Sequence, residues 1–231
     1  MASPYFFEKD IPDSDKFFLS EETSRHVSQV LRMKAGEEVI VTNGKGYTIK
    51  ANIVLADKKK TKIIITSKQF SERASPKTCI AISLIKNNSR FEWFVEKATE
   101  IGISAIIPLL CHRTEKTHFK KERINSILIS AMLQSQQSWL PELGEPLQFS
   151  EIVESVNYDQ QFIAHCIEKD KKELSEIVSK EASKIILIGP EGDFTEEEIY
   201  AAIQHNYIPV SLGQTRLRTE TAAIVATVLI K

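Results

Sequence analysis

Apolar and polar residues follow two different patterns along this chain, and the pattern changes near residue 78. Beyond that point, short apolar runs alternate with longer stretches in which apolar residues recur at helical spacing. The short runs predict buried strands and the longer stretches predict amphipathic helices. Regular alternation of the two is typical of a mainly parallel sheet, so this part of the chain is predicted to be α/β. The predicted strands are 78–85, 105–109, 162–167, 185–188 and 208–212, and the predicted helices are 90–101, 120–137, 171–180, 195–205 and 220–229.

Residues 1–70 have a different pattern, with shorter segments that alternate between apolar and polar residues. The dipeptide Asn43-Gly44, between two such segments, is the strongest short signal of a β-hairpin. A small β-rich domain is therefore predicted here. Its predicted strands are 38–42, 47–55 and 62–67, and its predicted helix is 21–33. Residues 71–77, which contain Pro76, serines and charged residues, are the predicted linker to a second domain at 78–231.

Polar residues and glycine mark the ends of the predicted helices. The run Asn87-Asn88-Ser89 supplies N-cap residues, and Gly102 is placed to end the same helix. Thr195 and Glu198 have the spacing of a capping box. These signals support the predicted helix boundaries.

Two loops that follow predicted strands are rich in residues that expose the backbone. Gly189-Pro190-Glu191-Gly192-Asp193-Phe194 follows the strand at 185–188, and the segment from Leu212 to Ala222 follows the strand at 208–212. Glycine lets backbone groups approach a ligand closely, and open α/β sheets bind ligands at the carboxyl ends of strands. Either loop alone would be an ordinary turn. Together they favour a small-molecule site at the ends of neighbouring strands.

The same loops carry a resemblance to a known family. The strings LIGPEGDF and LGQTRLRTETA resemble the paired signatures of the RsmE family, which are S-adenosylmethionine-dependent methyltransferases acting on N3 of a uridine in 16S ribosomal RNA. Several further segments are similar to that family in the same order along the chain, and four weak motifs in order make a specific match. They are Val30-Leu31-Arg32 with Gly36, Asn43-Gly44-Lys45-Gly46, Lys86 and Arg90 with the run Glu96 to Gly102, and Gln134-Ser135 with Leu140-Pro141.

The resemblance implies more about the fold than the periodicity does. Periodicity alone favours an unknotted Rossmann-like sheet. The RsmE family belongs to the SPOUT superfamily, so the resemblance implies a C-terminal SPOUT α/β domain with a deep trefoil knot. It also implies an N-terminal PUA-like RNA-binding β-barrel and a homodimer. The apolar helix predicted at 220–229 is compatible with burial in a core or a dimer interface.

The cofactor implied by the resemblance is S-adenosylmethionine, held largely by backbone groups of the two loops. The residues assigned to this binding are Leu187, Gly189, Pro190, Glu191, Gly192, Leu212, Gly213, Leu217 and Thr219. Asp193 stands where the family more often has glycine, and Gln136 and Gln137 stand where many members have a small residue and then arginine. His165 and Cys166 end a predicted strand and border the cofactor or simply pack there.

Methyl transfer to uridine N3 needs a cation that stabilises the uridinate, or a base that removes its proton. Arg218 is the first choice for the cation, ahead of Arg216, because it fits the family string Leu-Arg-Thr-Glu-Thr. A salt bridge from Arg218 to Glu191 or Glu220 is the alternative. Glu220 is taken as the second catalytic residue, but the choice between Glu220 and Glu191 as base stays open.

The net charge of −1 conceals an asymmetry between the two parts of the chain. Residues 1–125 carry 22 Lys and Arg against 15 Asp and Glu, and residues 126–231 carry 8 against 16. A basic half is suited to phosphate contacts. The predicted RNA-binding residues are Arg32, Lys34, Lys86 and Arg90, the last two beside a helix start. The expected partner is 16S rRNA, within the small ribosomal subunit.

The composition argues against several classes of protein. No run of 18 apolar residues exists, so no membrane partner is expected. Cys79, Cys111 and Cys166 are widely spaced and odd in number, which favours reduced thiols and a cytoplasmic location. No metal site is predicted. Two other functions stay open: a SPOUT 2′-O-ribose methyltransferase and a non-catalytic RNA-binding protein.

Overall fold

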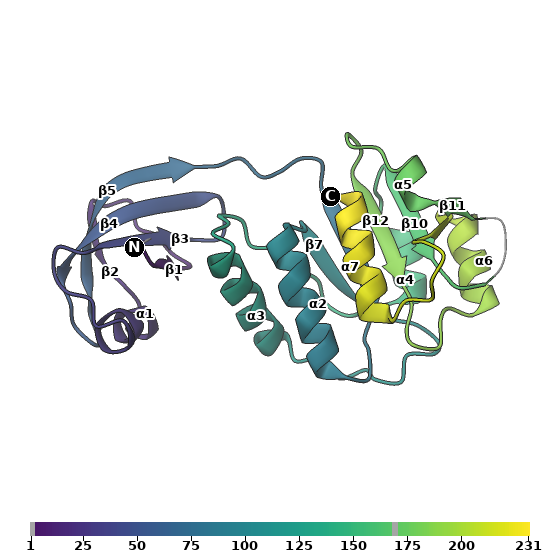
Figure 1. Cartoon of the computed structure of the whole chain (residues 1–231), viewed down its shortest axis with the longest axis horizontal. Coiled ribbons are helices and arrows are strands. Elements are labelled where there is room, and N and C mark those ends of the chain that lie inside the picture. Colours follow the sequence, from purple (N-terminus) through teal and green to yellow (C-terminus); the bar gives the residue numbers. More distant parts are fainter. Residues whose placement is uncertain (1–2, 168–170) are drawn as a thin grey trace. The chain divides into compact units, whose positions relative to one another are not determined.

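The structure, a computed structural model, describes residues 3–167 and 171–231. The described residues form two compact units (Figure 1). The first unit contains the chain up to Arg73 together with Ile129–Leu140, and the second contains Ala74–Leu128 together with Pro141–Lys231. Each unit has its own core.

A five-stranded sheet dominates the first unit, in the strand order β1-β3-β4-β5-β2. Among the strand pairs that the structure describes in this sheet, β1 with β3 is parallel and the others are antiparallel. The buried side chains Val39, Val41, Ile49 and Ile63 lie on alternate positions and form the core with Phe6. The strands are β1 (Tyr5–Phe7), β2 (Lys16–Phe18), β3 (Glu38–Thr42), β4 (Tyr47–Leu55) and β5 (Lys62–Phe70), and between β2 and β3 lie α1 (Glu21–Arg25) and the π-helix η1 (His26–Val30).

The second unit contains a larger sheet in the order β11-β13-β10-β12-β6-β7-β8, with β9 also paired to β7. All of its described strand pairs are parallel. The mainly parallel α/β sheet predicted from the sequence is therefore confirmed. Its elements are β6 (Thr78–Ser83), α2 (Asn88–Ile101), β7 (Ala105–Leu110), α3 (Lys121–Gln134, shared with the first unit), β8 (Glu142–Leu143), β9 (Leu147–Gln148), α4 (Phe149–Ser155), β10 (Gln160–Ala164), β11 (Lys172–Glu173), α5 (Leu174–Ile177), β12 (Lys184–Ile188), α6 (Glu196–Gln204), β13 (Ile208–Ser211) and α7 (Thr219–Ile230).

Both faces of the parallel sheet are covered. Cys79, Ala81 and Leu187 pack with α4 and α6 in one cluster, whereas the alternate residues Ile80 and Ile186 are equally buried. Helix α7 contacts β6 and β12 and lies beside α2 (Figure 1). Burial on both faces explains why these strands read as continuous apolar runs rather than as alternating ones.

The final helix is fixed at its end by a buried lysine. Lys184 is 2% exposed, and its Nζ donates to the backbone oxygen of Ile230 at 2.9 Å. An ammonium group at the C-terminal end of a helix is favourable because carbonyl groups there lack intrahelical partners. Burial lowers the pKa of Lys184. This contact ties β12 to the end of α7.

Several predicted helix ends are confirmed. Asn87 caps α2 by accepting from the Ser89 amide, and Gly102 ends the helix in the left-handed conformation at φ 93°. Thr195 and Glu198 form the predicted capping box of α6. The local signals were sufficient because capping depends only on residues within one turn.

Other predicted elements are wrong or incomplete. The predicted helix at 171–180 is replaced by β11 and the short α5, because Lys172 and Glu173 pair with β13 as an edge strand. The predicted helix at 21–33 is α-helical only to Arg25. Strands β1, β2, β8 and β9 and helix α4 were not predicted. These elements are too short for periodicity to reveal.

Among the described residues, no helix is long and apolar enough to cross a membrane.

Candidate functional site

Three strand ends in the second unit meet at one edge of the sheet. Strand β10 lies between β12 and β13, and Ala164 at its carboxyl end pairs with both Ile188 and Val210. The loops that leave these strands therefore start at the same level. The two strands with glycine-bearing loops are not neighbours, contrary to the sequence-based expectation, because β10 separates them. A third loop, which starts at His165, thus contributes to the same place.

Two cavities of about 410 Å³ each lie among these loops. They adjoin, because Ala164, Cys166, Arg216, Leu217 and Ala222 line both. The first cavity is further lined by Arg90, Ile188, Gly189, Pro190, Glu191, Asp193, Arg218, Thr219 and Glu220. The second is further lined by His165, Lys171, Val210, Ser211, Leu212, Gly213, Gln214 and Thr215.

Most of the residues predicted to bind a cofactor line one of these cavities. Gly189, Pro190, Glu191, Leu217 and Thr219 line the first cavity, and Leu212, Gly213 and Leu217 line the second. Leu187 and Gly192 are outside both linings. The Leu187 side chain is fully buried in the core, and the next residue, Ile188, already lines the first cavity.

Gly189 and Gly192 are required for different reasons. A Cβ on Gly189 would lie 3.1 Å from the ring of Phe194, which is fully buried in the core. A Cβ on Gly192 would instead face the side chain of Arg113, 3.3 Å from its Cδ. Arg113 also donates to the backbone oxygen of Gly192 at 2.7 Å. Gly192 therefore accommodates an arginine that braces the loop.

Asp193 fastens the loop after β12 to the end of β10. Its backbone is left-handed, at φ 62°, a conformation that glycine adopts most easily and that aspartate tolerates better than most residues. Its Oδ2 accepts from the Cys166 amide at 2.7 Å, and its Oδ1 accepts from the Phe194 amide at 2.9 Å. The side chain thus compensates for the backbone conformation, which accounts for aspartate at this position.

Replacing Asp193 with alanine is expected to lower the free energy of unfolding by about 1–3 kcal/mol, since two hydrogen bonds are lost and the left-handed backbone remains. Asp193→Asn keeps one acceptor oxygen and should lose clearly less. Urea denaturation of the two variants measures the difference. Equal stability of Asp193→Ala and the unmodified protein would show that the side chain does not hold the loop.

The carboxylates of the first cavity are held by partners on α2 and on the turn before it. Glu220 is only 8% exposed, and its Oε1 lies 3.5 Å from Nε of Arg90. Glu191 accepts from the Lys86 amide at 3.0 Å. These contacts join the first turn of α7 to α2 and the loop after β12 to the turn before α2. They also mean that both carboxylates have partners other than Arg218.

Arg218 is an exposed residue at the N-cap position of α7 and lines the first cavity. Its backbone oxygen accepts from the Ala222 amide at 2.8 Å, which fixes the start of the helix. Within the described part of the chain, its guanidinium group has no hydrogen bond or ion pair. Arg218 is therefore a charged group at the cavity with its donors available to a ligand.

The second cavity is lined by Gly213, whose backbone conformation requires glycine. Its φ is 120°, a region that other residues rarely adopt, and no atom lies within 4 Å of a Cβ built there. Lys171 donates to the His165 oxygen at 2.7 Å across this cavity's lining. Burial, followed by the charge of Asp193, raises the pKa of the Cys166 thiol. Cys166 thus borders both cavities as a protonated thiol.

Three of the four predicted RNA-binding residues are outside both cavity linings. Arg32 and Lys34 are exposed in the loop before β3 of the first unit. Lys86 is exposed, and its Nζ lies 2.9 Å from Oε2 of Glu115, whose hydrogen bond raises the pKa of Lys86. Arg90 alone among the four lines a cavity.

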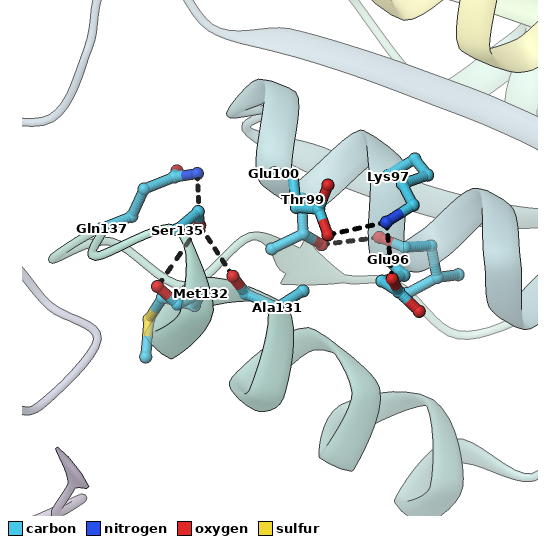
Figure 2. A network of polar contacts seen from close by, with 9 residues as sticks. Glu96, Lys97, Thr99, Glu100, Ala131, Met132, Ser135 and Gln137 are labelled. Atoms are coloured by element: carbon cyan, nitrogen blue, oxygen red, sulfur yellow. Dashed lines mark hydrogen bonds and ion pairs between the residues drawn. The ribbon is translucent and has the colours of Figure 1, made fainter. Parts of the chain in front are cut away.

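The motif residues of α2 and of the end of α3 make contacts within their own helices or turns. Lys97 Nζ lies 2.7 Å from Glu96 Oε1 and 2.9 Å from Glu100 Oε1, and Figure 2 marks both contacts with dashed lines. Ser135 donates to the Ala131 oxygen at 2.7 Å and accepts from the Gln137 amide side chain at 2.9 Å (Figure 2). Such contacts are those of structural polar residues.

No group of three or more His, Cys, Asp and Glu among the described residues is arranged to hold a metal ion.

Comparison with known proteins gives a consistent result along the chain. Residues 72–231 match the family model of an RNA methyltransferase domain, and residues 19–66 match that of an RNA methyltransferase PUA domain. The ribosomal RNA small subunit methyltransferase E of Buchnera aphidicola is 32% identical over 233 residues, which cover 96% of this chain and 89% of that protein.

Two solved structures are similar over nearly the whole chain. A probable rRNA-methyltransferase from Porphyromonas gingivalis has a TM-score of 0.89 at 32% identity and covers 97% of this chain and 95% of its own. A putative methyltransferase from Legionella pneumophila, solved with the bound cofactor SAM, has a TM-score of 0.89 at 29% identity. The match covers 100% of this chain and 97% of that one.

Proposed function

The chain belongs to the family of ribosomal RNA small subunit methyltransferase E, and we propose that it transfers a methyl group from S-adenosylmethionine to N3 of a uridine in 16S ribosomal RNA. The observation that carries this proposal is the pair of adjoining cavities at the carboxyl ends of β10, β12 and β13, with a charged group, Arg218, available at the lining. Ligands bind at this edge in open parallel sheets.

The loop residues fit an S-adenosylmethionine molecule. Gly189, Gly213 and Leu217 present backbone and apolar surface, and each cavity is of a size typical of small-molecule sites. When bound, this cofactor supplies a methyl group on a sulfonium cation, which becomes neutral as the methyl leaves. We assign cofactor binding to Leu187, Gly189, Pro190, Glu191, Gly192, Leu212, Gly213, Leu217 and Thr219. Leu187 and Gly192 do not line a cavity, so they support the residues that do.

The chain's own residues must bring the uracil ring into line and make N3 nucleophilic. The N3 lone pair forms the new bond to carbon, and the N3 proton must leave. We assign Arg218 to stabilise the uridinate, because its guanidinium is charged at all relevant pH values and carries several donors. The proton acceptor is Glu191 or Glu220, two of the carboxylates that line the first cavity, and Glu220 is our assignment.

Arg90 serves as the positioning partner of Glu220 in this proposal. The two side chains lie 3.5 Å apart, and the Glu220 side chain is 10% exposed, so removal of Arg90 would leave a largely buried carboxylate without its charged partner. Because Glu220 pairs with Arg90, the guanidinium group of Arg218 remains available to the substrate. Arg90 can in addition contact an RNA phosphate from the start of α2.

RNA binding by the first unit is assigned to exposed cations. Arg32 and Lys34 flank Met33 in the loop that precedes β3, and both are exposed. Charge-neutral variants of such residues weaken binding to any RNA sequence and reduce its salt dependence. Lys86, at the turn before α2, is the corresponding residue of the second unit.

Replacing Arg32 and Lys34 together with alanine is expected to reduce the slope of log K against log salt concentration by about 1–2. Cofactor affinity should not change, because neither residue lines a cavity of the candidate site. Fluorescence anisotropy with labelled 16S rRNA fragments between about 50 and 200 mM salt measures the slope. An unchanged slope would remove both residues from the RNA interface.

The family also supports finer structural proposals. We propose that residues 1–70 form a PUA-like β-barrel, that 71–77 act as a linker, and that 78–231 form a SPOUT domain with a deep trefoil knot, of which Ile129–Leu140 cluster with the first unit. We further propose a homodimer that acts on the small ribosomal subunit in the cytoplasm. The apolar α7 is consistent with these features, since its 12 residues include buried Ala223, Ala226 and Ile230 as well as Val228, which is 58% exposed.

The function is tested by supplying purified protein with methyl-labelled S-adenosylmethionine and with small subunits from cells that lack the gene. Incorporation of label into 16S rRNA is expected. The same subunits from cells that carry the gene should accept no further label, because their target is already methylated. Absence of label from the first substrate, with a folded protein that binds the cofactor, would contradict the proposal.

A further inference from the structure

Three aromatic rings form a row on the first unit that the assigned RNA contacts do not include. Tyr47 and Phe70 lie opposite each other on β4 and β5, with ring centroids 5.0 Å apart. Phe70 also meets Trp139 at 6.2 Å in an edge contact. Phe70 is 52% exposed and Tyr47 is 37% exposed. Large rings that remain this exposed beside one another contribute little to the core.

The backbone around the rings holds them in place. Gly46 has φ 89°, and a Cβ there would lie 2.7 Å from the Phe70 ring and 2.8 Å from the Trp139 ring. Trp139 Nε1 donates to the Ser71 oxygen at 2.8 Å, and the Ser71 amide donates to the Gly46 oxygen at 2.9 Å. The rings thus form a preorganised surface with little side-chain entropy left to lose on binding.

A cation lies over each end of the row. Lys68 Nζ is 5.0 Å from the centroid of Tyr47, and Cζ of Arg73 is 5.4 Å from the centroid of Trp139. The segment 43–73 that contains most of the row has eight Lys and Arg against two Asp and Glu. The nearby carboxylate of Asp13 is fully exposed and 3.9 Å from Lys68, so water largely screens it.

We propose that Tyr47, Phe70 and Trp139 form a stacking platform for unpaired bases of the RNA substrate, with Lys68 and Arg73 contacting the phosphates on either side. The rings are inclined by 53° and 75° to one another, so each offers its own face to an unstacked base, and positive charge at the ends matches a backbone that continues past them. The inference rests on the proposed function, because it takes the ligand to be RNA. It adds a contact to bases where Arg32 and Lys34 contact phosphates only.

The two tryptophans of the chain make a direct test available. Trp93, 44% exposed on α2, belongs to the second unit, so Trp93→Phe leaves Trp139 as the single tryptophan reporter. An unpaired oligouridylate of about 12 nucleotides serves as the probe, beside a duplex of the same length. Stacking is expected to quench Trp139 fluorescence with the single strand, and the duplex should quench it much less.

Phe70→Ala in this background is expected to weaken single-strand binding by about 10-fold. The matched control is Phe18→Ala, because Phe18 is 53% exposed on β2 and also lies beneath a lysine, with Lys62 Nζ at 5.4 Å. The control should bind as the parent does. Since stacking involves no counterion release, the loss in Phe70→Ala should be the same at low and high salt.

Three results would overturn the platform. The first is no quenching of Trp139 while anisotropy shows saturated RNA binding, and the second is an equal loss of single-strand affinity in Phe18→Ala. The third is unchanged RNA affinity in Phe70→Ala with an altered sedimentation mass. The last would assign the rings to a protein contact. Calorimetric binding of S-adenosylmethionine separates these results from failure of the proposed function. A protein that binds the cofactor and methylates 16S rRNA but shows no quenching refutes the platform alone.

Discussion

Arg218→Ala is expected to lower the rate constant of methyl transfer by about 100-fold or more, with little change in the affinity for either substrate. The guanidinium lies at the lining of the first cavity, on the N-cap residue of α7. Since the lining residues Glu191 and Glu220 are held by the Lys86 amide and by Arg90, Arg218 has no structural partner to lose among the described residues. The effect should therefore appear when negative charge develops on the uracil ring.

Single-turnover methylation beside a thermal melt measures this effect. Arg218→Lys keeps the charge but not the planar array of donors, so it should recover only part of the rate. Arg216→Ala is the matched comparison, because Arg216 is exposed in the same loop and lines both cavities. A larger loss of rate in Arg216→Ala, or a lower melting temperature with intact turnover in Arg218→Ala, would contradict the assignment.

Ala222→Leu is expected to weaken binding of S-adenosylmethionine by roughly 10- to 100-fold without unfolding the protein. Ala222 lines both cavities from the first turn of α7, and leucine is a good helix former. The larger side chain would extend into the space assigned to the cofactor. Titration calorimetry gives the affinity.

The control for this variant is Thr221→Leu, one residue earlier on the same helix and outside both cavity linings. Its cofactor affinity should equal that of the unmodified protein. Unchanged binding in a folded Ala222→Leu protein would show that the cofactor lies elsewhere. A Gly192→Val variant is a poor substitute for this experiment, since the new side chain would meet Arg113 instead of a cavity.

Local chemistry made much of the second unit predictable. The capping box at Thr195 and the glycine stop at Gly102 depend on residues within one helical turn, and apolar runs such as 184–188 are buried on both faces. Where pairing with a distant strand determines the secondary structure of a segment, the local sequence did not predict it. Lys172 and Glu173 have helical propensity but pair with β13 at an edge of the sheet.

In the candidate site, too, some features follow from local sequence and others depend on the tertiary structure. The loops after β12 and β13 are recognisable from their glycines, but the position of β10 between those strands is a property of the sheet order. Ala164 consequently lines both cavities although no motif marks it, and Cys166, which was expected at a strand end that borders the cofactor or simply packs, lines both as well. The pairing of Arg90 with Glu220 joins residues 130 positions apart, so sequence spacing could not reveal it.

The most direct test of the central claim is nucleoside mass spectrometry of 16S rRNA from cells with and without this gene. The account predicts one uridine methylated on N3 when the gene is present and unmethylated when it is absent, and restored by the unmodified protein but not by Arg218→Ala. Methylation on the ribose 2′ oxygen instead, or identical rRNA from both strains, would contradict it.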